Sequence, residues 1–137
     1  MYEFELINLA KAQNKKIKGL ETLNGQLDFF AKAYPKDFLW QQIELHEAYK
    51  VMFQEMVTNY KNENITALFD GMNDERFLNK NAEYWMLTYR NKNWIEKMPA
   101  LMKKQPNLFA VGAAHLVGDN GVIHLLRKQG YKVTPVH

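Results

Sequence analysis

A histidine follows a glycine by three positions in the Gly112-x-x-His115 motif, directly after the apolar run 108–111. A neutral imidazole can bind a divalent metal through one ring nitrogen, or transfer a proton near neutral pH. Gly112 permits the tight turn that would direct His115 outward from the end of a strand. The alternative is a loop histidine that only donates a hydrogen bond to a backbone carbonyl. The position after a predicted strand favours a site, because such loops bind ligands in α/β sheets.

Glu21 and Arg90 are the two charged residues that we expect to join His115. Glu21 follows the predicted strand 17–20, where a carboxylate could bind a metal, polarise a water or orient a histidine. Its alternative role is to begin the next helix, where the helix dipole favours an acidic residue. Arg90 lies on an apolar helix face, so its guanidinium needs a partner, with Glu21 first and a substrate carboxylate or carbonyl second. The alternative for Arg90 is an arginine at the edge of the core that reaches solvent, and Asn91 could complete the polar cluster.

Two other histidines, His46 and His124, are not expected to bind a metal. His46-Glu47 begins like the helix motif of zinc proteases, but Lys50 stands where that motif requires a second histidine. His124 falls opposite the apolar arc of its predicted helix and should face solvent. The glycine-rich segment 118–121 has no following Lys-Ser or Lys-Thr, so it predicts a turn before a helix rather than a phosphate-binding loop.

These residues must be positioned by a helix-rich chain with a few short strands. Hydrophobic periodicity, breakers and caps predict an α/β fold in which helices pack around a small sheet of about three short strands. We expect Pro99 to kink or break its helix near Met98. The predicted helices are 2–13, 24–33, 37–60, 65–70, 74–78, 82–104 and 119–129, and the predicted strands are 17–20, 108–111 and 131–134.

Length and composition limit the classes of protein that the chain can belong to. The 137 residues are 47% hydrophobic and 13% aromatic, which suits one globular domain with its own core. The absence of cysteine excludes disulfides, thiolate catalysis and cysteine-based zinc sites. A net charge of +3, scattered along the chain, argues against nucleic-acid binding. There is no transmembrane segment and residues 1–5 do not resemble a signal peptide, so the start was removed or the protein stays in the cytoplasm, and localisation remains open.

Three parts of the chain together resemble the TraB/GumN (TraB/PrgY/GumN) family, relatives of the Tiki proteins, which are metal-dependent proteases. The family also has an earlier Gly-x-x-His motif in a preceding strand, and this chain contains no such motif. The resemblance therefore covers roughly the C-terminal half of the family domain. The matching parts are Gly112-x-x-His115 with its flanks, Gly19-Leu20-Glu21-Thr22 with Gln26, and Arg90-Asn91 with Met98-Pro99.

The resemblance implies one domain over 1–137 that lacks the family's N-terminal strands, with a metal-dependent hydrolase or protease as its function. His115 would be a metal ligand, Glu21 a ligand or general base, and Arg90 a third site residue. Two protein ligands are fewer than the three of a usual catalytic zinc site. We therefore expect weak binding of manganese, cobalt or zinc and an incomplete or inactive isolated chain. The alternative is a non-catalytic binding or regulatory module on the same scaffold.

The sequence predicts the partners of the chain less specifically than it predicts the site. The substrate would be a peptide or a small molecule. A sheet that lacks its neighbouring strands would expose unpaired amides and apolar side chains along one edge, and proteins seldom leave such an edge bare. We therefore expect self-association, most simply as a two-fold homodimer with Tyr, Trp and Met side chains in the contact.

Overall fold

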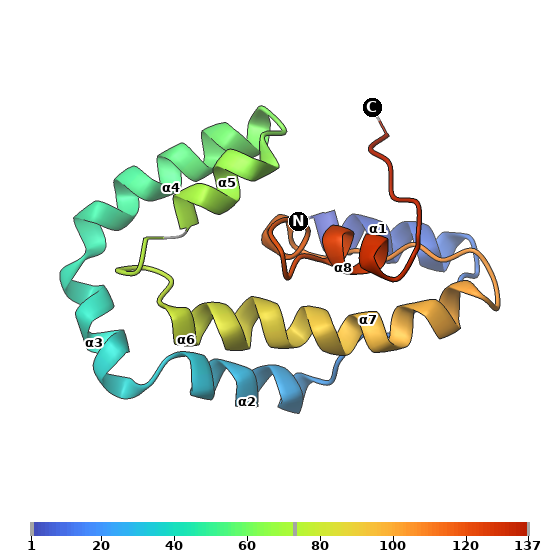
Figure 1. The fold of residues 1–137 in the computed structure, drawn as a ribbon, viewed down its shortest axis with the longest axis horizontal. Helices are drawn as coiled ribbons and strands as arrows, with labels where there is room; N and C mark the ends of the chain where they lie inside the picture. The colour runs from blue at the N-terminus through green and yellow to red at the C-terminus, as the bar shows by residue number, and fades with distance from the viewer. Residues whose placement is uncertain (1, 73, 137) are drawn as a thin grey trace.

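The computed structural model describes residues 2–72 and 74–136, and every regular element in these ranges is a helix. Figure 1 shows a long central helix with the other helices arranged around it. In chain order the elements are α1 (Tyr2–Ala12), α2 (Leu23–Ala33), α3 (Lys36–Glu44), α4 (His46–Lys61), α5 (Ile65–Met72), α6 (Lys80–Glu83), the π-helix η1 (Tyr84–Thr88), α7 (Tyr89–Met102), the 3₁₀ turn η2 (Ala113–His115) and α8 (Val122–Lys128).

The central helix is formed by α6, η1 and α7, which continue into one another without a break. It begins at the N-cap Asn79, whose side chain accepts a hydrogen bond from the amide of Ala82 at 2.9 Å. The wider turns of η1 then change the direction in which the following side chains point. Pro99 lies inside α7, which continues to Met102, so of the kink or break expected near Met98 the break does not occur.

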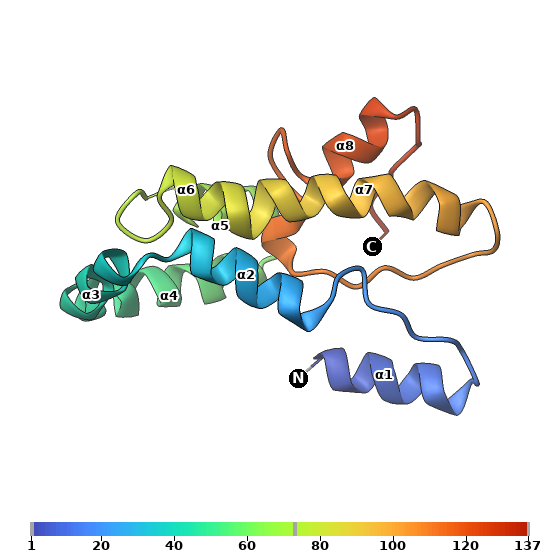
Figure 2. The same cartoon turned by 90° about the horizontal axis from the view of Figure 1, so that it is seen from below.

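Two buried clusters pack α2 and α8 against the central helix. One cluster consists of Ala33, Leu78, Ala82 and Leu87 and joins α2 to α6 and η1. The other contains Trp94, Ile95, Met98 and Val122, and it joins α7 to α8. Figure 2 shows α2 and α8 on different faces of the central helix. The turn that carries His115 therefore lies beside a helix that is held on two sides.

The predicted sheet is absent from the part of the chain that the structure describes, so the α/β fold class was wrong. Segments 17–20, 108–111 and 131–134 have no regular secondary structure and form no strands. A strand requires a neighbouring strand to complete its backbone hydrogen bonds, and here side chains serve some of those groups instead. Lys97 Nζ donates to the carbonyl of Leu20 at 2.8 Å, and Arg127 Nη2 to that of Val133 at 2.7 Å.

Apolar side chains of the first two segments nevertheless cover the core as a strand would. Leu20, Phe109 and Val111 pack against the cluster on α7 and α8. The apolar pattern therefore identified segments that cover the core, while their backbone pairing was predicted wrongly. The pattern reports burial, and burial alone does not require a sheet.

Two helix predictions also need correction. The predicted helix 37–60 is divided at Leu45 into α3 and α4, and segment 74–78 forms turns instead of a helix. Across the described ranges, no helix is both long enough and apolar enough to cross a membrane.

Candidate functional site

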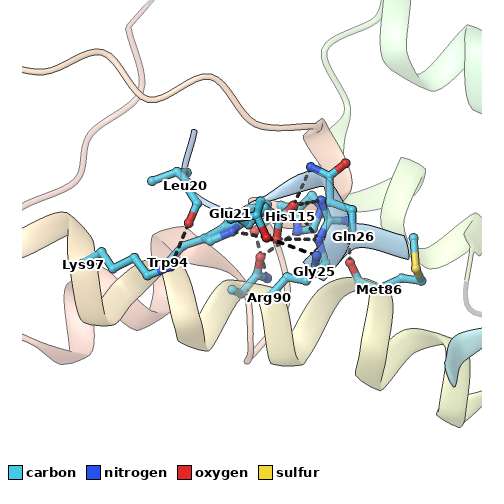
Figure 3. Close-up of polar contacts among 11 residues, drawn as sticks. Leu20, Glu21, Gly25, Gln26, Met86, Arg90, Trp94, Lys97 and His115 are labelled. Atoms are coloured by element: carbon cyan, nitrogen blue, oxygen red, sulfur yellow. Dashed lines mark hydrogen bonds and ion pairs between the residues drawn. The ribbon is translucent and has the colours of Figure 1, made fainter. Parts of the chain in front are cut away.

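The carboxylate of Glu21 accepts hydrogen bonds from three side chains. Arg90 provides the closest contact, with Nη2 at 2.5 Å from Oε1 and Nε at 3.1 and 3.2 Å from the two oxygens. Trp94 Nε1 donates to Oε2 at 3.2 Å, and Gln26 Nε2 donates to Oε1 at 3.0 Å. Figure 3 shows these groups gathered around Glu21. Both carboxylate oxygens are therefore engaged by protein donors.

This environment keeps Glu21 ionised. Burial by itself would raise the pKa of Glu21, but the hydrogen bonds and charge of Arg90, with the hydrogen bonds of Trp94 and Gln26, lower that pKa overall. Arg90 and Glu21 form an ion pair whose side chains are only 16% and 12% exposed. Arg90 Nη1 also donates to the carbonyl of Met86 at 3.1 Å, which anchors the guanidinium to its own helix. A carboxylate with a lowered pKa is a weak proton acceptor near neutral pH.

The ring of His115 is oriented by Asn91 on α7. His115 Nδ1 lies 2.7 Å from Asn91 Oδ1. The Asn91 amide nitrogen donates to the carbonyls of Asn120 at 2.8 Å and His115 at 3.3 Å, which fixes Oδ1 as the acceptor facing the ring. The neutral His115 ring therefore carries its proton on Nδ1 and leaves a lone pair on Nε2.

Burial keeps this imidazole neutral. His115 is 7% exposed, and its ring packs at a tilt on Trp94 with 4.5 Å between centroids. Burial first, then the positive charge of Arg90, lowers the pKa of His115 to about 4, while the charge of Glu21 acts in the opposite direction. No fully buried side-chain nitrogen or oxygen among the described residues lacks a hydrogen-bond partner. Because Nε2 has no protein partner there, this nitrogen reaches solvent.

The expected convergence of Glu21, Arg90 and His115 is present, although the strands that were expected to produce it are not. Trp94 links the three, because its indole donates to Glu21 and its ring packs on His115. Trp94 was not among the site residues expected from the sequence. Its position four residues after Arg90, on the same helix face, was the available signal.

The segment between His115 and α8 is a closely packed turn, as its sequence predicted. Gly118 has φ of +80°, and the amide of Gly121 donates to the carbonyl of Gly118 at 2.9 Å. A side chain at position 121 would place its Cβ only 2.2 Å from the carbonyl oxygen of Val117. This turn brings the carbonyl of Asn120 to Asn91. His124, beyond it on α8, is exposed as expected.

The fit of these residues to a divalent metal is partial. His115 has the geometry of a ligand, with one ring nitrogen held by a hydrogen bond and the other open. The oxygens of Glu21 are occupied by Arg90, Trp94 and Gln26. Within residues 2–72 and 74–136 there is no group of three His, Cys, Asp or Glu side chains that could hold an ion. These residues thus offer one well-oriented ligand and no complete metal site.

Comparison with known proteins defines the family. Residues 2–135 match the TraB/PrgY/gumN family, and the chain belongs to that family. It is 43% identical over 47 residues to the Metalloprotease TIKI homolog of Amphimedon queenslandica, a match that covers 32% of this chain and 9% of that protein. Metalloprotease TIKI1 of Danio rerio is also 43% identical over 47 residues, which cover 32% of this chain and 10% of the relative. The chain therefore matches only about a tenth of these relatives, and no solved structure gives a significant match.

Proposed function

We propose that this chain carries part of a metal-dependent hydrolase site of the peptidase type, in which His115 contributes one metal ligand through Nε2. The observation that carries the proposal is the state of this ring: neutral, with Nδ1 bonded to Asn91 and Nε2 open. Histidines that bind metals commonly donate their other ring N–H to such an acceptor. The metalloprotease names of the partial relatives support the same reaction class.

In this proposal Glu21 acts through Arg90 and is neither the ligand nor the general base that the family resemblance suggested. Its carboxylate holds the guanidinium and offsets part of the positive charge of Arg90 near the His115 ring, whose neutral state comes first from burial. A divalent ion at Nε2 would supply a Lewis acid and an activated water. Its remaining ligands would come from outside the described residues, and the substrate would be a peptide or another small molecule.

Metal binding is tested by following the imidazole signals by nuclear magnetic resonance during addition of Co²⁺. We expect the His115 ring to broaden and shift first, with weak affinity, because one protein ligand leaves most coordination positions to water. His115→Gln should remove this response, and His124→Gln, which changes an exposed histidine on α8, should retain it. Equal broadening of all histidines would contradict the proposal.

The partial nature of the site is tested separately by calorimetry and chelation. We expect no tight one-to-one binding of manganese, cobalt or zinc, and chelators should change the melting temperature by less than about 1 °C. A tight stoichiometric site would overturn the partial-site proposal and would indicate a complete set of ligands in this chain.

A non-catalytic binding module is the second candidate function. It is favoured by the complete use of the Glu21 carboxylate in hydrogen bonds to Arg90, Trp94 and Gln26. Under this alternative, metal-dependent hydrolysis of a peptide library would be absent, and His115→Gln would leave peptide binding unchanged. Metal-dependent hydrolysis that His115→Gln abolishes would exclude it.

A further inference from the structure

A recess beside Asn91 does not include His115 among its lining residues. It is a cavity of about 440 Å³ between α5, the central helix and the turn that follows η2. Figure 1 shows α5 and this turn above the same half of the central helix. The turn approaches α5 closely, since a Cβ at Gly118 would lie 3.0 Å from the ring of Phe69. The volume falls within the usual range for small-molecule sites.

Thr88 lies in the wall of this cavity, and its hydroxyl has no hydrogen-bond partner among the described residues. Thr88 is 7% exposed, lines the cavity and closes the π-helix η1. In the described residues its hydroxyl makes no hydrogen bond, whereas the amide of neighbouring Asn91 is fully used by His115 and Asn120. Because fully buried polar atoms without partners are absent from the described residues, the Thr88 hydroxyl oxygen is not fully buried, and Thr88 lines the cavity. Such π-helical turns frequently occur at functional sites.

The rim of the cavity carries more acidic than basic groups. Glu75, Glu83 and Asp119 line it together with Lys80 as the single cation. Lys80 lies 3.9 Å from Glu75, so this pair is close to neutral. Glu83 and Asp119 form no ion pair with any described residue, and they leave two negative charges at the rim. The lining also includes four apolar side chains, those of Phe69, Leu78, Leu87 and Val117.

We propose that this cavity binds an alkylammonium group, such as the side chain of a peptide lysine. The apolar side chains of the lining suit the methylene chain, and the carboxylates of Glu83 and Asp119 attract the charged end. An ammonium has three donors and no acceptor, so it can donate to the Thr88 hydroxyl oxygen. The inference goes beyond the proposed function, because it requires no metal and does not use His115 Nε2.

The test measures binding of three matched probes to the metal-free chain by amide chemical-shift changes. The probes are Nα-acetyl-lysine methylamide, n-pentylamine as a free amine, and Nα-acetyl-norleucine methylamide as a neutral control of similar length. We expect both amines to bind and to shift the signals of residues around Thr88, while the norleucine probe binds at least about three-fold more weakly. Tighter binding of the lysine probe than of pentylamine would identify a peptide as the source, and the reverse a free amine. Equal binding of the norleucine probe would overturn the proposal.

Charge variants then locate the cation. Glu83→Gln and Asp119→Asn should each weaken lysine-probe binding by about three-fold, and the double variant by about ten-fold. The matched control is Glu96→Gln, which removes one exposed negative charge from α7 away from the cavity and should have little effect. If Glu96→Gln weakens binding as much as Asp119→Asn, binding depends only on the net charge of the chain, and the proposed position of the ammonium in the cavity is wrong. In the unmodified chain, 0.5 M salt should weaken amine binding, which provides a test independent of variant folding.

The Thr88 hydroxyl is tested with nearly isosteric variants. Thr88→Val should weaken amine binding by about five-fold, and Thr88→Ser should retain it, because only the serine keeps the hydroxyl. Both variants should melt within a few degrees of the unmodified chain, since this hydroxyl has no protein partner to lose. Unchanged amine affinity in Thr88→Val would contradict the proposed position of the ammonium.

Discussion

A large aromatic side chain is buried in the region around His115, whereas several are exposed in the region of α1 and α3. Trp94 is 4% exposed and bonded to Glu21, whereas Trp40 on α3 is 62% exposed. Helix α1 has no buried residue, although Tyr2 and Phe4 are large apolar side chains. Figure 2 shows α1 apart from the central helix. The perturbed pKa values of Glu21 and His115 therefore occur where helix packing excludes water, and not merely where suitable residue types are present.

The largest expected effect compares the two tryptophans. Trp94→Ala should lower the free energy of unfolding by about 4 kcal/mol, because it removes a buried indole and one hydrogen bond to Glu21. Trp40→Ala should change the same free energy by about 0.5 kcal/mol, because its side chain already lies in solvent. Urea titrations of both variants provide the measurement. Similar losses of unfolding free energy in the two variants would show that Trp94 and Trp40 do not differ in burial as described.

The next effect compares a buried ion pair with an exposed one. Arg90→Met should cost about 3 kcal/mol of unfolding free energy, since it leaves the Glu21 carboxylate covered and without its cation. Lys50→Met breaks the exposed pair with Glu47 and should cost about 0.5 kcal/mol. Adding Glu21→Gln to Arg90→Met should restore part of the loss. A double variant less stable than Arg90→Met would count against charge burial as the cause.

Stability should also depend on pH through His115. Its pKa is about 4 in the folded chain and 6.5 as the ordinary value, so between these values the unfolded state binds more protons. Stability should therefore fall as pH is lowered, by about 2 kcal/mol from pH 6.5 to pH 5. The lowered pKa of Glu21 adds a loss only below its ordinary value of 4.5, outside this window. Urea titrations should show a flatter dependence for His115→Gln and the original one for His124→Gln.

The last prediction concerns self-association through the exposed surface of α3. The variant that tests it should change the free energy of unfolding least. The edge of a sheet no longer provides the surface, because the described residues contain no sheet, but α3 exposes Leu39, Trp40 and Ile43. We expect a dimer at high concentration that dissociates on dilution, measured by light scattering. Trp40→Ser should weaken the dimer while changing unfolding of the monomer by less than about 0.5 kcal/mol. A well-folded monomer that persists at high concentration would contradict this prediction.

Local signals predicted much of the helical structure and one contact of the candidate site. Periodicity gave α1 and α2 to within one residue, and the need of Arg90 on an apolar helix face for a carboxylate partner predicted its pairing with Glu21. The division of the predicted helix 37–60 at Leu45 and the turns at 74–78 were not predicted, because helix propensities there differ little and packing decides the boundaries. The roles of Trp94 and Asn120 depend on contacts between segments far apart in the chain.

The sequence by itself determined which side chains are available: one histidine after a glycine-led turn, one carboxylate after an apolar run, and an arginine and an asparagine side by side on a helix. Only the tertiary structure decided their chemical states. Asn91 sets the His115 tautomer, while Arg90 and Trp94 occupy the Glu21 oxygens. The physical reason is that the tautomer and the pKa depend on burial and on partners brought together from distant parts of the chain. For the same reason 17–20, 108–111 and 131–134 could not be distinguished from strands, because an apolar run records that a segment is covered and does not record its hydrogen-bond partner.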